Sequence, residues 1–324
     1  MNQKIISIIV LNWNGKVYLK ECLESLAAQT YKNFEVIFVD NGSIDGSIEY
    51  VKNNFPEVKI LTLIKNTGFC KGNNEGIKIS NGEYVALLNN DTKTDPYWLE
   101  ELHKAILKYP SVGFYASKII FYSDREKIDA VGDGYSFCGA GFKRGHFEHK
   151  DKYNKEEKVF GSCAGAAIYK KSMLNDIGLL DEDFFLGCED IDLSFRAQLK
   201  GYKCLYIPKA IVYHKISATI GKLSRLQVYY GQRNNEYVYI KNMPSAFILR
   251  YFLSHLFYNL VSFVFFLIKG KGIIFLKAKC SVLKNFPILL KKRKIIQNNR
   301  KVDNSYLKKI MERRCFSVRI KGKI

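Results

Sequence analysis

The first hundred residues alternate between short apolar runs and amphipathic segments, and this rhythm limits the possible folds more than any other feature. The apolar runs, three of them rich in β-branched residues, are Ile5–Leu11, Phe34–Asp40, Val58–Leu63 and Tyr84–Asn89. Each run is followed by a loop containing Asn, Gly or Asp, and then by a helical pattern at Val17–Ala28, Ser47–Asn53, Lys71–Ile79 or Tyr97–Lys108. Strands that alternate with helices predict an α/β fold with a mostly parallel sheet flanked by helices. Ligands of such sheets bind beyond the carboxyl ends of the strands.

The pattern becomes mixed between Val112 and about His214. Strand-like segments at Phe114–Tyr122, Ala166–Tyr169 and Lys203–Ile207 surround one clear helix, Ile191–Lys200, which Gly201 ends. A Tyr-rich helix is expected over Arg225–Lys241. We expect one globular domain over residues 1–240 and a separate helical segment over residues 241–324.

The net charge of +20 is distributed very unevenly. Residues 241–324 contain 20 Lys or Arg against two acids, a net charge of +18, which leaves +2 for residues 1–240. A basic segment prefers an anionic surface, either phospholipid or nucleic acid. The apolar stretches in this segment favour lipid, so we expect no nucleic-acid partner.

Eight cysteines are scattered without a Cys-x-x-Cys pair. This spacing is typical of free thiols in a reducing compartment and not of a disulfide framework or a zinc site.

Polar side chains follow three of the apolar runs. They are Asn12 and Asn14 after the first run, Asp40 and Asn41 at the end of the second, and Asn89, Asn90 and Asp91 at the end of the fourth. A divalent cation that bridges a diphosphate needs a carboxylate at a rigid strand end, and Asp91 is the best candidate. The alternative is an ordinary turn or a helix-entry loop, where Asn, Asp and Ser are common.

The loop Asn66–Gly76 is rich in Gly and Asn and contains Lys71. Its glycines allow a close backbone approach, and its amides and lysine suit an anionic ligand. It lacks the spacing of a Walker loop and of Gly-x-Gly-x-x-Gly, which argues against an ATPase or a dehydrogenase.

Three acids, Glu189, Asp190 and Asp192, crowd the first turn of the expected helix near residue 191. The helix dipole stabilises acids there, so a purely structural cap is one interpretation. Crowded carboxylates also raise one another's proton affinity, which suits a general base. His214 follows an apolar strand; such a histidine is usually structural, but its neutral nitrogen could complete a metal site with Asp91.

These motifs together resemble glycosyltransferase family 2, the inverting enzymes with the Rossmann-like GT-A fold. The resemblance covers roughly residues 4–240 and is closest to rhamnosyltransferase-type members that build bacterial surface polysaccharides. Its motifs are Ile8–Asn14, Val39–Ser43, Asn66–Gly76, Leu88–Asp91, Gly161–Ala166, Gly178–Phe185, Glu189–Leu193 with Arg196, and Tyr213-His214.

The resemblance implies a role for each matching residue. Asp190 is expected to be the general base, with Glu189 as the second candidate. Asp91 and His214 are expected to hold Mg²⁺ or Mn²⁺, although Asn89 stands where the family has the first acid of its Asp-x-Asp motif. The donor site is expected to comprise Asn12, Asn14, Asp40, Asn41, Asn66, Gly68, Lys71, Asn73, Asn89, Asn90 and Arg233.

The implied activity is transfer of a sugar from a nucleotide diphosphate donor to a hydroxyl of a lipid-linked or polysaccharide acceptor. Rhamnose is a family-level expectation for the sugar; galactose, glucose and N-acetylglucosamine stay open. The alternative is a non-catalytic nucleotide-sugar-binding membrane scaffold of the same fold.

The location follows from the donor, because nucleotide sugars are cytosolic. Ala246–Ile268 is strongly apolar, and within it Tyr251–Ile268 is 18 residues without a charge, borderline for a membrane span. A single span would put the catalytic body and the basic residues that follow it on opposite sides, against the positive-inside rule. With a second apolar and basic segment at Ile273–Ile296, we expect interfacial helices on the inner face of the cell membrane.

Overall fold

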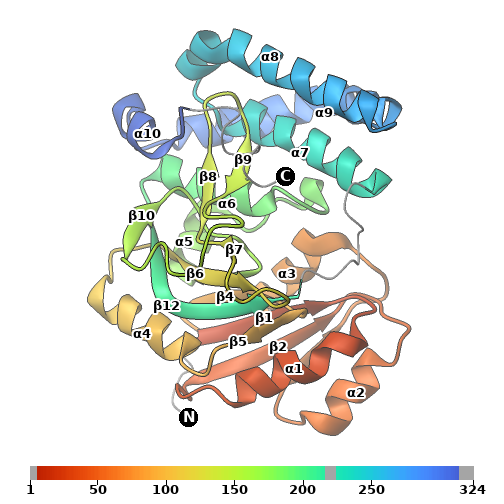
Figure 1. Ribbon diagram of the computed structural model, residues 1–324, viewed down its shortest axis with the longest axis vertical. Helices are drawn as coiled ribbons and strands as arrows, with labels where there is room; N and C mark the ends of the chain where they lie inside the picture. Colours follow the sequence, from red (N-terminus) through yellow and green to blue (C-terminus); the bar gives the residue numbers. More distant parts are fainter. Residues whose placement is uncertain (1–5, 216–223, 314–324) are drawn as a thin grey trace.

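A computed structural model describes residues 6–215 and 224–313. One mixed sheet forms its centre, with the strand order β10-β12-β6-β11-β4-β1-β2-β3 (Figure 1). These strands are β1 (Ile6–Asn12), β2 (Phe34–Asp40), β3 (Lys59–Thr62), β4 (Tyr84–Asn89), β6 (Phe114–Phe121), β10 (Glu157–Val159), β11 (Ala166–Lys170) and β12 (Cys204–His214).

Most of the sheet is parallel, as the sequence predicts. Strands β3, β2, β1 and β4 are successively parallel, and β12 is parallel to β6. The antiparallel neighbours are β11, between β4 and β6, and β10, on the outer side of β12. Two short strands pair beside this path: β5 (Thr92–Thr94) on β12 and β7 (Ile128–Ala130) on β6.

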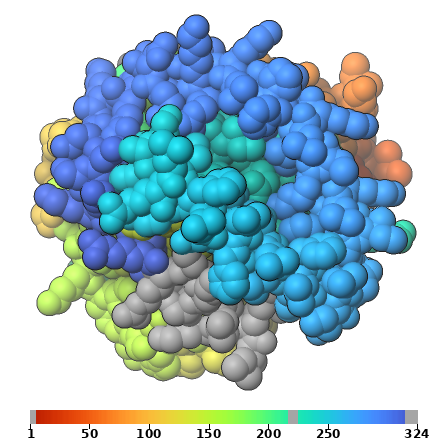
Figure 2. Space-filling model, turned by 90° about the horizontal axis from the view of Figure 1, so that it is seen from above, coloured from red at the N-terminus to blue at the C-terminus, as the bar shows by residue number. Residues whose placement is uncertain are grey.

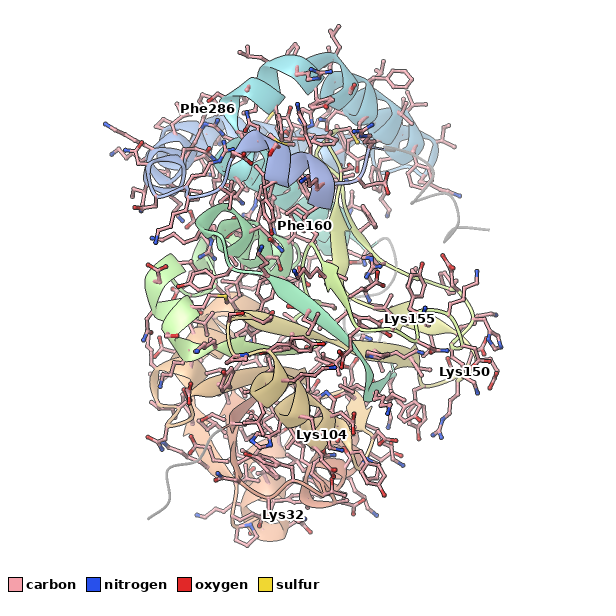
Figure 3. All side chains as sticks on the ribbon, turned by 90° about the vertical axis from the view of Figure 1, so that its left-hand side faces the viewer. Lys32, Lys104, Lys150, Lys155, Phe160 and Phe286 are labelled. Atoms are coloured by element: carbon pink, nitrogen blue, oxygen red, sulfur yellow. The ribbon has the colours of Figure 1, made fainter. Side chains whose placement is uncertain are left out.

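Alternation along the strands gives the sheet two buried faces. In β1, Ile8 and Val10 join one hydrophobic cluster, with α1 (Lys16–Ala27) and α4 (Trp98–Lys108). Ile9 joins the other cluster, with α3 (Gly68–Lys78), α5 (Lys171–Ile177) and α6 (Glu189–Lys200). Figure 3 shows this layering from the side, with Lys104 of α4 on one side of the sheet. Helix α2 (Ser47–Asn54) lies next to α1, and its Val51 joins the same cluster as Ile8 and Val10 (Figure 1). Each fully buried aliphatic side chain contributes about 1.5–3 kcal/mol.

The predicted boundary of the last strand was wrong. The sequence places a strand over Lys203–Ile207, but β12 continues to His214. Pro208 interrupts the strand pattern, since proline cannot donate a ladder hydrogen bond. The register against β6 shifts between Ile207 and Ile211, so an irregularity there lets the strand continue past Pro208.

Several short elements were not predicted. They are α5, α10 (Asn304–Ile310), β5, β7, β10, the short helix Glu182–Phe184, and the hairpin of β8 (Asp133–Tyr135) and β9 (Gly141–Lys143). Segments of three to seven residues show too few periods for a pattern to be recognised.

The C-terminal helices pack on one end of the sheet layer (Figure 1). They are α7 (Arg225–Asn242), α8 (Ser245–Ile268), α9 (Gly272–Asn298) and α10. Tyr237 of α7, Phe247 of α8 and Leu289 of α9 belong to the same hydrophobic cluster as Ile9. The division at residue 240 stays a prediction; it falls inside α7, and α7, α8 and α9 share one core with the sheet. Seven of the eight cysteines form no disulfide among the described residues, and Cys315 lies outside them.

A buried ionic network fixes α7 to α6. Lys241, only 1% exposed, pairs with Asp181 and, at 2.9 Å, with Asp192. Asp192 also accepts hydrogen bonds from Arg196 Nε and Asn242 Nδ2, both at 2.8 Å. Asp192 therefore holds the helices together, unlike its neighbours Glu189 and Asp190.

Replacing Lys241 tests this network. Lys241→Met should lower the free energy of unfolding by about 3–5 kcal/mol, because it removes the buried ammonium that lies between Asp181 and Asp192 and leaves their charges less compensated. The matched control is Lys78→Met, which removes an exposed pair with Glu75 and should cost about 0–1 kcal/mol. Urea denaturation followed by circular dichroism measures both, and equal losses would contradict a structural role for the network.

Candidate active site

Three neighbouring strands bring polar side chains to one edge of the sheet. Asn12 ends β1 directly opposite Asp40, which ends β2. Asn12 Oδ1 accepts a hydrogen bond of 2.6 Å from Asn90 Nδ2, just beyond β4, and Asn12 Nδ2 donates to Ser43 Oγ (3.1 Å) and to Asp40 Oδ1 (3.4 Å). Three of the predicted donor-site residues therefore form one continuous row.

The turn after β2 is built from the same side chains. Asp40 Oδ2 accepts a 2.9 Å hydrogen bond from Ser43 N. Asn14, in a left-handed conformation (φ 50°), accepts from Ile44 N at 2.8 Å and donates its own N–H to Ser43 Oγ. Asp40 thus has a clear structural task in the turn, and its reading of a nucleotide base stays a prediction.

The side chains of Asn41 and Asn66 hold the turn that leads into α3, whereas Asn73 lies within that helix. Asn41 Nδ2 donates to Asn66 Oδ1 (3.1 Å) and to the carbonyl of Gly68 (3.2 Å), while Asn73 Nδ2 donates to Phe69 O (2.9 Å). Gly68 has φ +86°, and a Cβ there would lie 2.6 Å from the ring of Phe185, so the loop needs glycine. Lys71 is exposed nearby on α3.

His214 joins the polar edge from the far side of the sheet. It pairs with Thr92 of β5, so its ring lies beside Asp91, with Nε2 3.3 Å from Asp91 Oδ1. Its Nδ1 lies 2.9 Å from Asp129 Oδ2, and both oxygens of Asp129 accept from Lys143 Nζ at 2.8 Å. Burial alone would lower the pKa of His214, but the hydrogen bonds to Asp129 and Asp91 outweigh it and raise the pKa to about 9.

These residues fit a divalent cation. Two ligands at right angles on an ion of Mg²⁺ size, each about 2.1 Å away, lie about 3.0 Å apart, close to the observed 3.3 Å between Asp91 and His214. A histidine that binds a metal almost always has its other ring nitrogen on a carboxylate or carbonyl, which is the position of Asp129. The carboxylate oxygen suits Mg²⁺ or Mn²⁺, and the imidazole nitrogen favours Mn²⁺, the transition metal, of the two.

Asp190 lies at the start of α6 beside the loop that ends in Gly165. Its Oδ1 accepts from Ile191 N at 2.8 Å and its Oδ2 from Ala164 N at 3.4 Å. Burial raises the pKa of Asp190 despite these donors. Glu189 is buried with no hydrogen-bond partner for Oε2 among the described residues, and burial and then the charge of Asp190 raise its pKa to about 8. The environments therefore differ: two backbone N–H groups favour the charged form of Asp190, whereas Glu189, with a pKa of about 8, holds its proton at pH 7.

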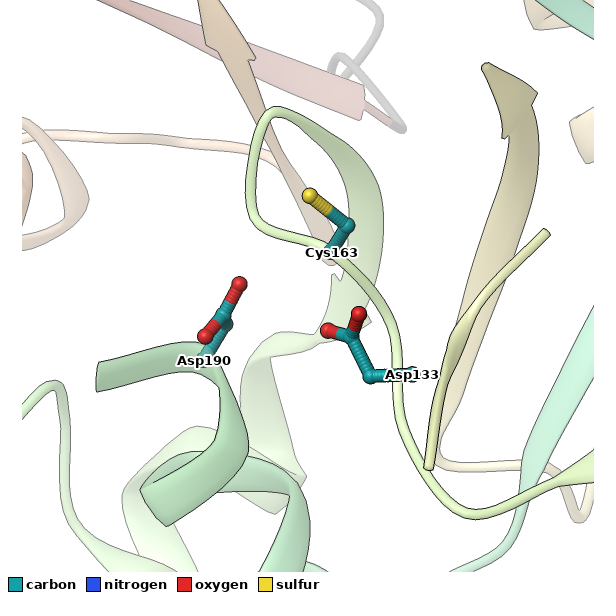
Figure 4. Close-up of side chains that lie close together, drawn as sticks. All are labelled: Asp133, Cys163 and Asp190. Carbon is teal, nitrogen blue, oxygen red and sulfur yellow. The ribbon is translucent and has the colours of Figure 1, made fainter. Parts of the chain in front are cut away.

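Asp190 belongs to a second group of acidic side chains, with Asp133 and Cys163. Oxygens of Asp133 and Asp190 and the Sγ of Cys163 lie within 4.8 Å of one another, and Figure 4 shows the Asp133 carboxylate turned toward Asp190. Asp133 Oδ2 is buried with no hydrogen-bond partner among the described residues. The ammonium of Lys143 is near enough to act on all three groups, and its charge disfavours a cation among them.

Two contacts join the Asp190 region to the metal-site candidates. Asn89 N donates to Gly165 O at 3.0 Å, and the adjacent Ala164 N donates to Asp190. Lys143 binds Asp129 of the His214 network and acts electrostatically on Asp190. The structure thus brings Asn12, Asp40, Asn89, Asn90, Asp91, His214 and Asp190 to one polar region.

Arg233 makes its contacts with the turn before α6. Its guanidinium donates to the carbonyls of Asp183 (2.5 Å) and Phe184 (3.2 Å) and lies over the rings of Tyr230 and Tyr237. Arg233 therefore holds the turn that precedes α6, and its contact with a diphosphate stays a prediction.

The sequence did not predict a role in the site for Asp129, Asp133 or Lys143. They lie on strands of three residues in a region with no recognisable period, and their partners are far away in the chain. The run from Asp129 to Asp133 with Gly132 and Gly134 is the one local hint, since glycines beside acids allow close packing.

Comparison with known proteins decides the family. Residues 7–178 match the family model for Glycosyl transferase family 2. The chain belongs to this family.

Its relatives within family 2 carry different names. The chain is 29% identical to glycosyltransferase GlyA of Streptococcus pneumoniae over 68% of this chain and 32% of GlyA. It is 28% identical to the poly-beta-1,6-N-acetyl-D-glucosamine synthase of Staphylococcus epidermidis (71% and 55%). The N-acetylglucosaminyl-diphospho-decaprenol L-rhamnosyltransferase of Mycobacterium tuberculosis is 22% identical (66% and 78%). The chain thus spans a third to about half of the length of the first two.

Solved structures confirm the GT-A fold of this family 2 member. GalNAc-T7 with UDP, GalNAc and Mn²⁺ superimposes with a TM-score of 0.60 at 16% identity, covering 74% of this chain and 48% of that one. Residues 1–349 of Staphylococcus aureus TarS with UDP give a TM-score of 0.53 at 21% identity, covering 74% and 67%.

The carboxylate behind His214 offers a test of the metal site. Asp129→Asn should weaken Mn²⁺ binding about 10- to 100-fold, because the ring of His214 loses the partner that orients it. Calorimetric titration with Mn²⁺ in the presence of UDP measures the affinity, and circular dichroism checks folding. The matched control is Asp124→Asn, an exposed acid paired with Lys127, which should bind Mn²⁺ like wild type. Equal affinity in both variants would contradict the placement of the cation on His214.

Proposed function

We propose that the chain is an inverting, metal-dependent glycosyltransferase that uses a nucleoside diphosphate sugar. The observation that carries this proposal is the position of Asp190, whose carboxyl oxygens accept hydrogen bonds from the N–H groups of Ile191 and Ala164, next to the loop that binds Asn89. A buried carboxylate with raised proton affinity suits removal of a proton from a hydroxyl.

The proposed reaction uses the two sides of the polar region differently. Asp190 takes the proton from the acceptor hydroxyl. The hydroxyl oxygen attacks the anomeric carbon of the donor sugar from the face opposite the nucleotide. The configuration at the anomeric carbon therefore inverts. A cation held by Asp91 and His214 would supply Lewis-acid stabilisation of the departing diphosphate. Glu189, neutral beside Asp190, keeps a second negative charge away from the base.

The donor site is proposed along the edge where β1, β2 and β4 end. Asn12, Asp40 and Asn90 are linked there by hydrogen bonds, which fixes their direction before a ligand arrives. We propose that the sugar is a hexose or a deoxyhexose such as rhamnose. The names of the Mycobacterium tuberculosis and Staphylococcus epidermidis relatives support both classes.

We further propose that the acceptor is a saccharide or a lipid-linked saccharide and that the protein works at the inner face of the cell membrane. The concentration of positive charge in residues 241–324, next to apolar helices, supports an anionic lipid surface.

Removing the base tests the activity. We expect a screen of nucleotide sugars with Mg²⁺ or Mn²⁺ to reveal hydrolysis or transfer that EDTA abolishes. In Asp190→Asn this rate should fall about 10²- to 10⁴-fold while UDP binding is retained, because proton removal is lost without loss of the donor site. The control is Asp176→Asn, an acid paired with Lys200 on the outside of the fold. An unchanged rate in Asp190→Asn would reject the base assignment, and no metal-dependent turnover of any donor would favour the non-catalytic scaffold.

The pH dependence separates the two acids. Only ionised Asp190 accepts a proton, so kcat/KM should rise with pH through a pKa above the ordinary value of about 3.9. Glu189 stays protonated below its pKa of about 8, so the neutral Glu189→Gln should leave this acid limb in place. A shift of the limb by about one pH unit or more toward acid would mean that both carboxylates are charged, against the assignment.

A further inference from the structure

Helix α8 has one face against the protein and one against solvent. The buried positions are Phe247, His255, Tyr258, Ser262 and Phe266. The opposite side carries large apolar residues, each more than half exposed, which we call the α8 outer face: Leu249, Leu253, Leu256, Leu260, Leu267 and Ile268. Within each set the members lie three or four residues apart, or two turns apart, except for the adjacent pair Leu267 and Ile268, as residues on one side of a helix do. A continuous exposed apolar stripe of this kind marks an interaction surface.

Length and composition alone would let α8 cross a bilayer, and it is the one helix among the described residues that passes this criterion. Its contacts argue against crossing. Phe247 stacks edge-on against Phe137 (5.3 Å between ring centres), and Phe266 clusters with Val228 and Phe275. These contacts lie 19 residues apart, about 28 Å along the helix, which is nearly the full thickness of the hydrocarbon layer. Protein therefore covers one side of α8 along its whole length.

Buried charges strengthen this attachment. Glu236 of α7 pairs with His255 Nε2 of α8 at 3.0 Å and with Lys279 Nζ of α9 at 2.6 Å. His255 Nδ1 lies 2.8 Å from the carbonyl of Cys138, at the tip of the β8–β9 hairpin. If α8 detached to span a membrane, Glu236 would lose His255 and keep only Lys279. Breaking a buried ionic network in this way is strongly unfavourable.

The charges around this surface point to an anionic partner. Residues 237–302 contain no Asp or Glu, whereas exposed Lys269 follows α8 and exposed Lys277 and Lys284 lie on α9. Between these lysines α9 exposes Ile273, Leu276 and Leu283. Phe286, which Figure 3 labels in the helical layer, follows Lys284 and is also exposed. Figure 2 shows α8 and α9 side by side on one face of the molecule. An apolar stripe with basic flanks matches the boundary between acyl chains and anionic headgroups.

We propose that the α8 outer face lies flat in the surface of an anionic phospholipid bilayer, with the lysines of α9 at the headgroups and the catalytic body outside the membrane. This placement specifies the proposed location and does not depend on the proposed chemistry. It makes α8 an in-plane anchor, and it positions the enzyme where a lipid-linked acceptor is presented.

Vesicle binding tests the surface. The full chain is sedimented with vesicles of phosphatidylglycerol and phosphatidylcholine in equal parts, and with vesicles of phosphatidylcholine alone. The double variant Leu253→Ser/Leu256→Ser should bind the anionic vesicles at least tenfold more weakly than wild type, and wild type should bind the neutral vesicles more weakly. The matched control is Val17→Ser/Leu107→Ser, two equally exposed apolar residues outside α8, which should bind like wild type.

Equal binding of both double variants would overturn the α8 outer face as the contact. The proposal would also be overturned if the wild-type chain did not bind anionic vesicles but formed a dimer through Leu253 and Leu256. A second copy of the chain would then cover the α8 outer face. Donor hydrolysis in detergent-free solution is measured in parallel. A chain that turns over a donor without binding vesicles would refute the docking and leave the proposed activity standing.

Depth measurements distinguish lying flat from crossing. An environment-sensitive dye is attached to one cysteine at a time, in the variants Leu249→Cys, Leu256→Cys and Leu267→Cys, each in a Cys280→Ser background. Quenchers carried by the lipids measure the depth of the dye in the bilayer. The three positions span 18 residues, about 27 Å. An in-plane helix gives one shallow depth for all three. A crossing helix would place residue 256 far deeper than residues 249 and 267, and that result would overturn the proposal.

Discussion

The pairing of β12 with β5 is the constraint on which the candidate site depends. It sets His214 opposite Thr92, so two residues more than a hundred positions apart become neighbours, and Asp91 comes within 3.3 Å of the histidine ring. The parallel pairing of β12 with β6 and the pairing of β7 with β6 then bring Asp129 to the other ring nitrogen. Without this arrangement of short strands, Asp91 would be an acid at a turn and His214 a histidine at a strand end.

The second half of the site depends on how unequally two adjacent acids are solvated. Both oxygens of Asp190 accept a backbone N–H group, whereas backbone hydrogen bonds reach only part of the Glu189 carboxyl and its Oε2 has no partner among the described residues. The same burial therefore costs Glu189 more as an anion, and the proton stays on it. Lys143 adds a positive charge that acts on Asp190 and also binds Asp129, so the electrostatics of the two halves are coupled.

The sequence predicted the features that are coded locally. Apolar runs with β-branched residues identified β1, β2 and β4, and because parallel strands end at one edge, Asn12, Asp40 and Asn90 were expected together there. Asp129, Asp133 and Lys143 could not be found in this way. They lie on strands of three residues, which form only by pairing with segments distant in the chain. The continuation of β12 was not predicted because Pro208 interrupts the strand pattern. Arg233 illustrates the converse: its type suits a phosphate, but packing against Tyr230 and Tyr237 commits it to the turn before α6.

The position of the cation is the decisive measurement for this site, because the fold offers two acidic groups for a metal ion. Crystals grown with UDP and Mn²⁺ would locate the ion by its anomalous diffraction. We expect a peak that contacts Asp91 Oδ1 and His214 Nε2, with Asp190 outside its ligand sphere. A peak among Asp133, Cys163 and Asp190 would overturn the assignment of Asp190 as the base, since it would then be a metal ligand.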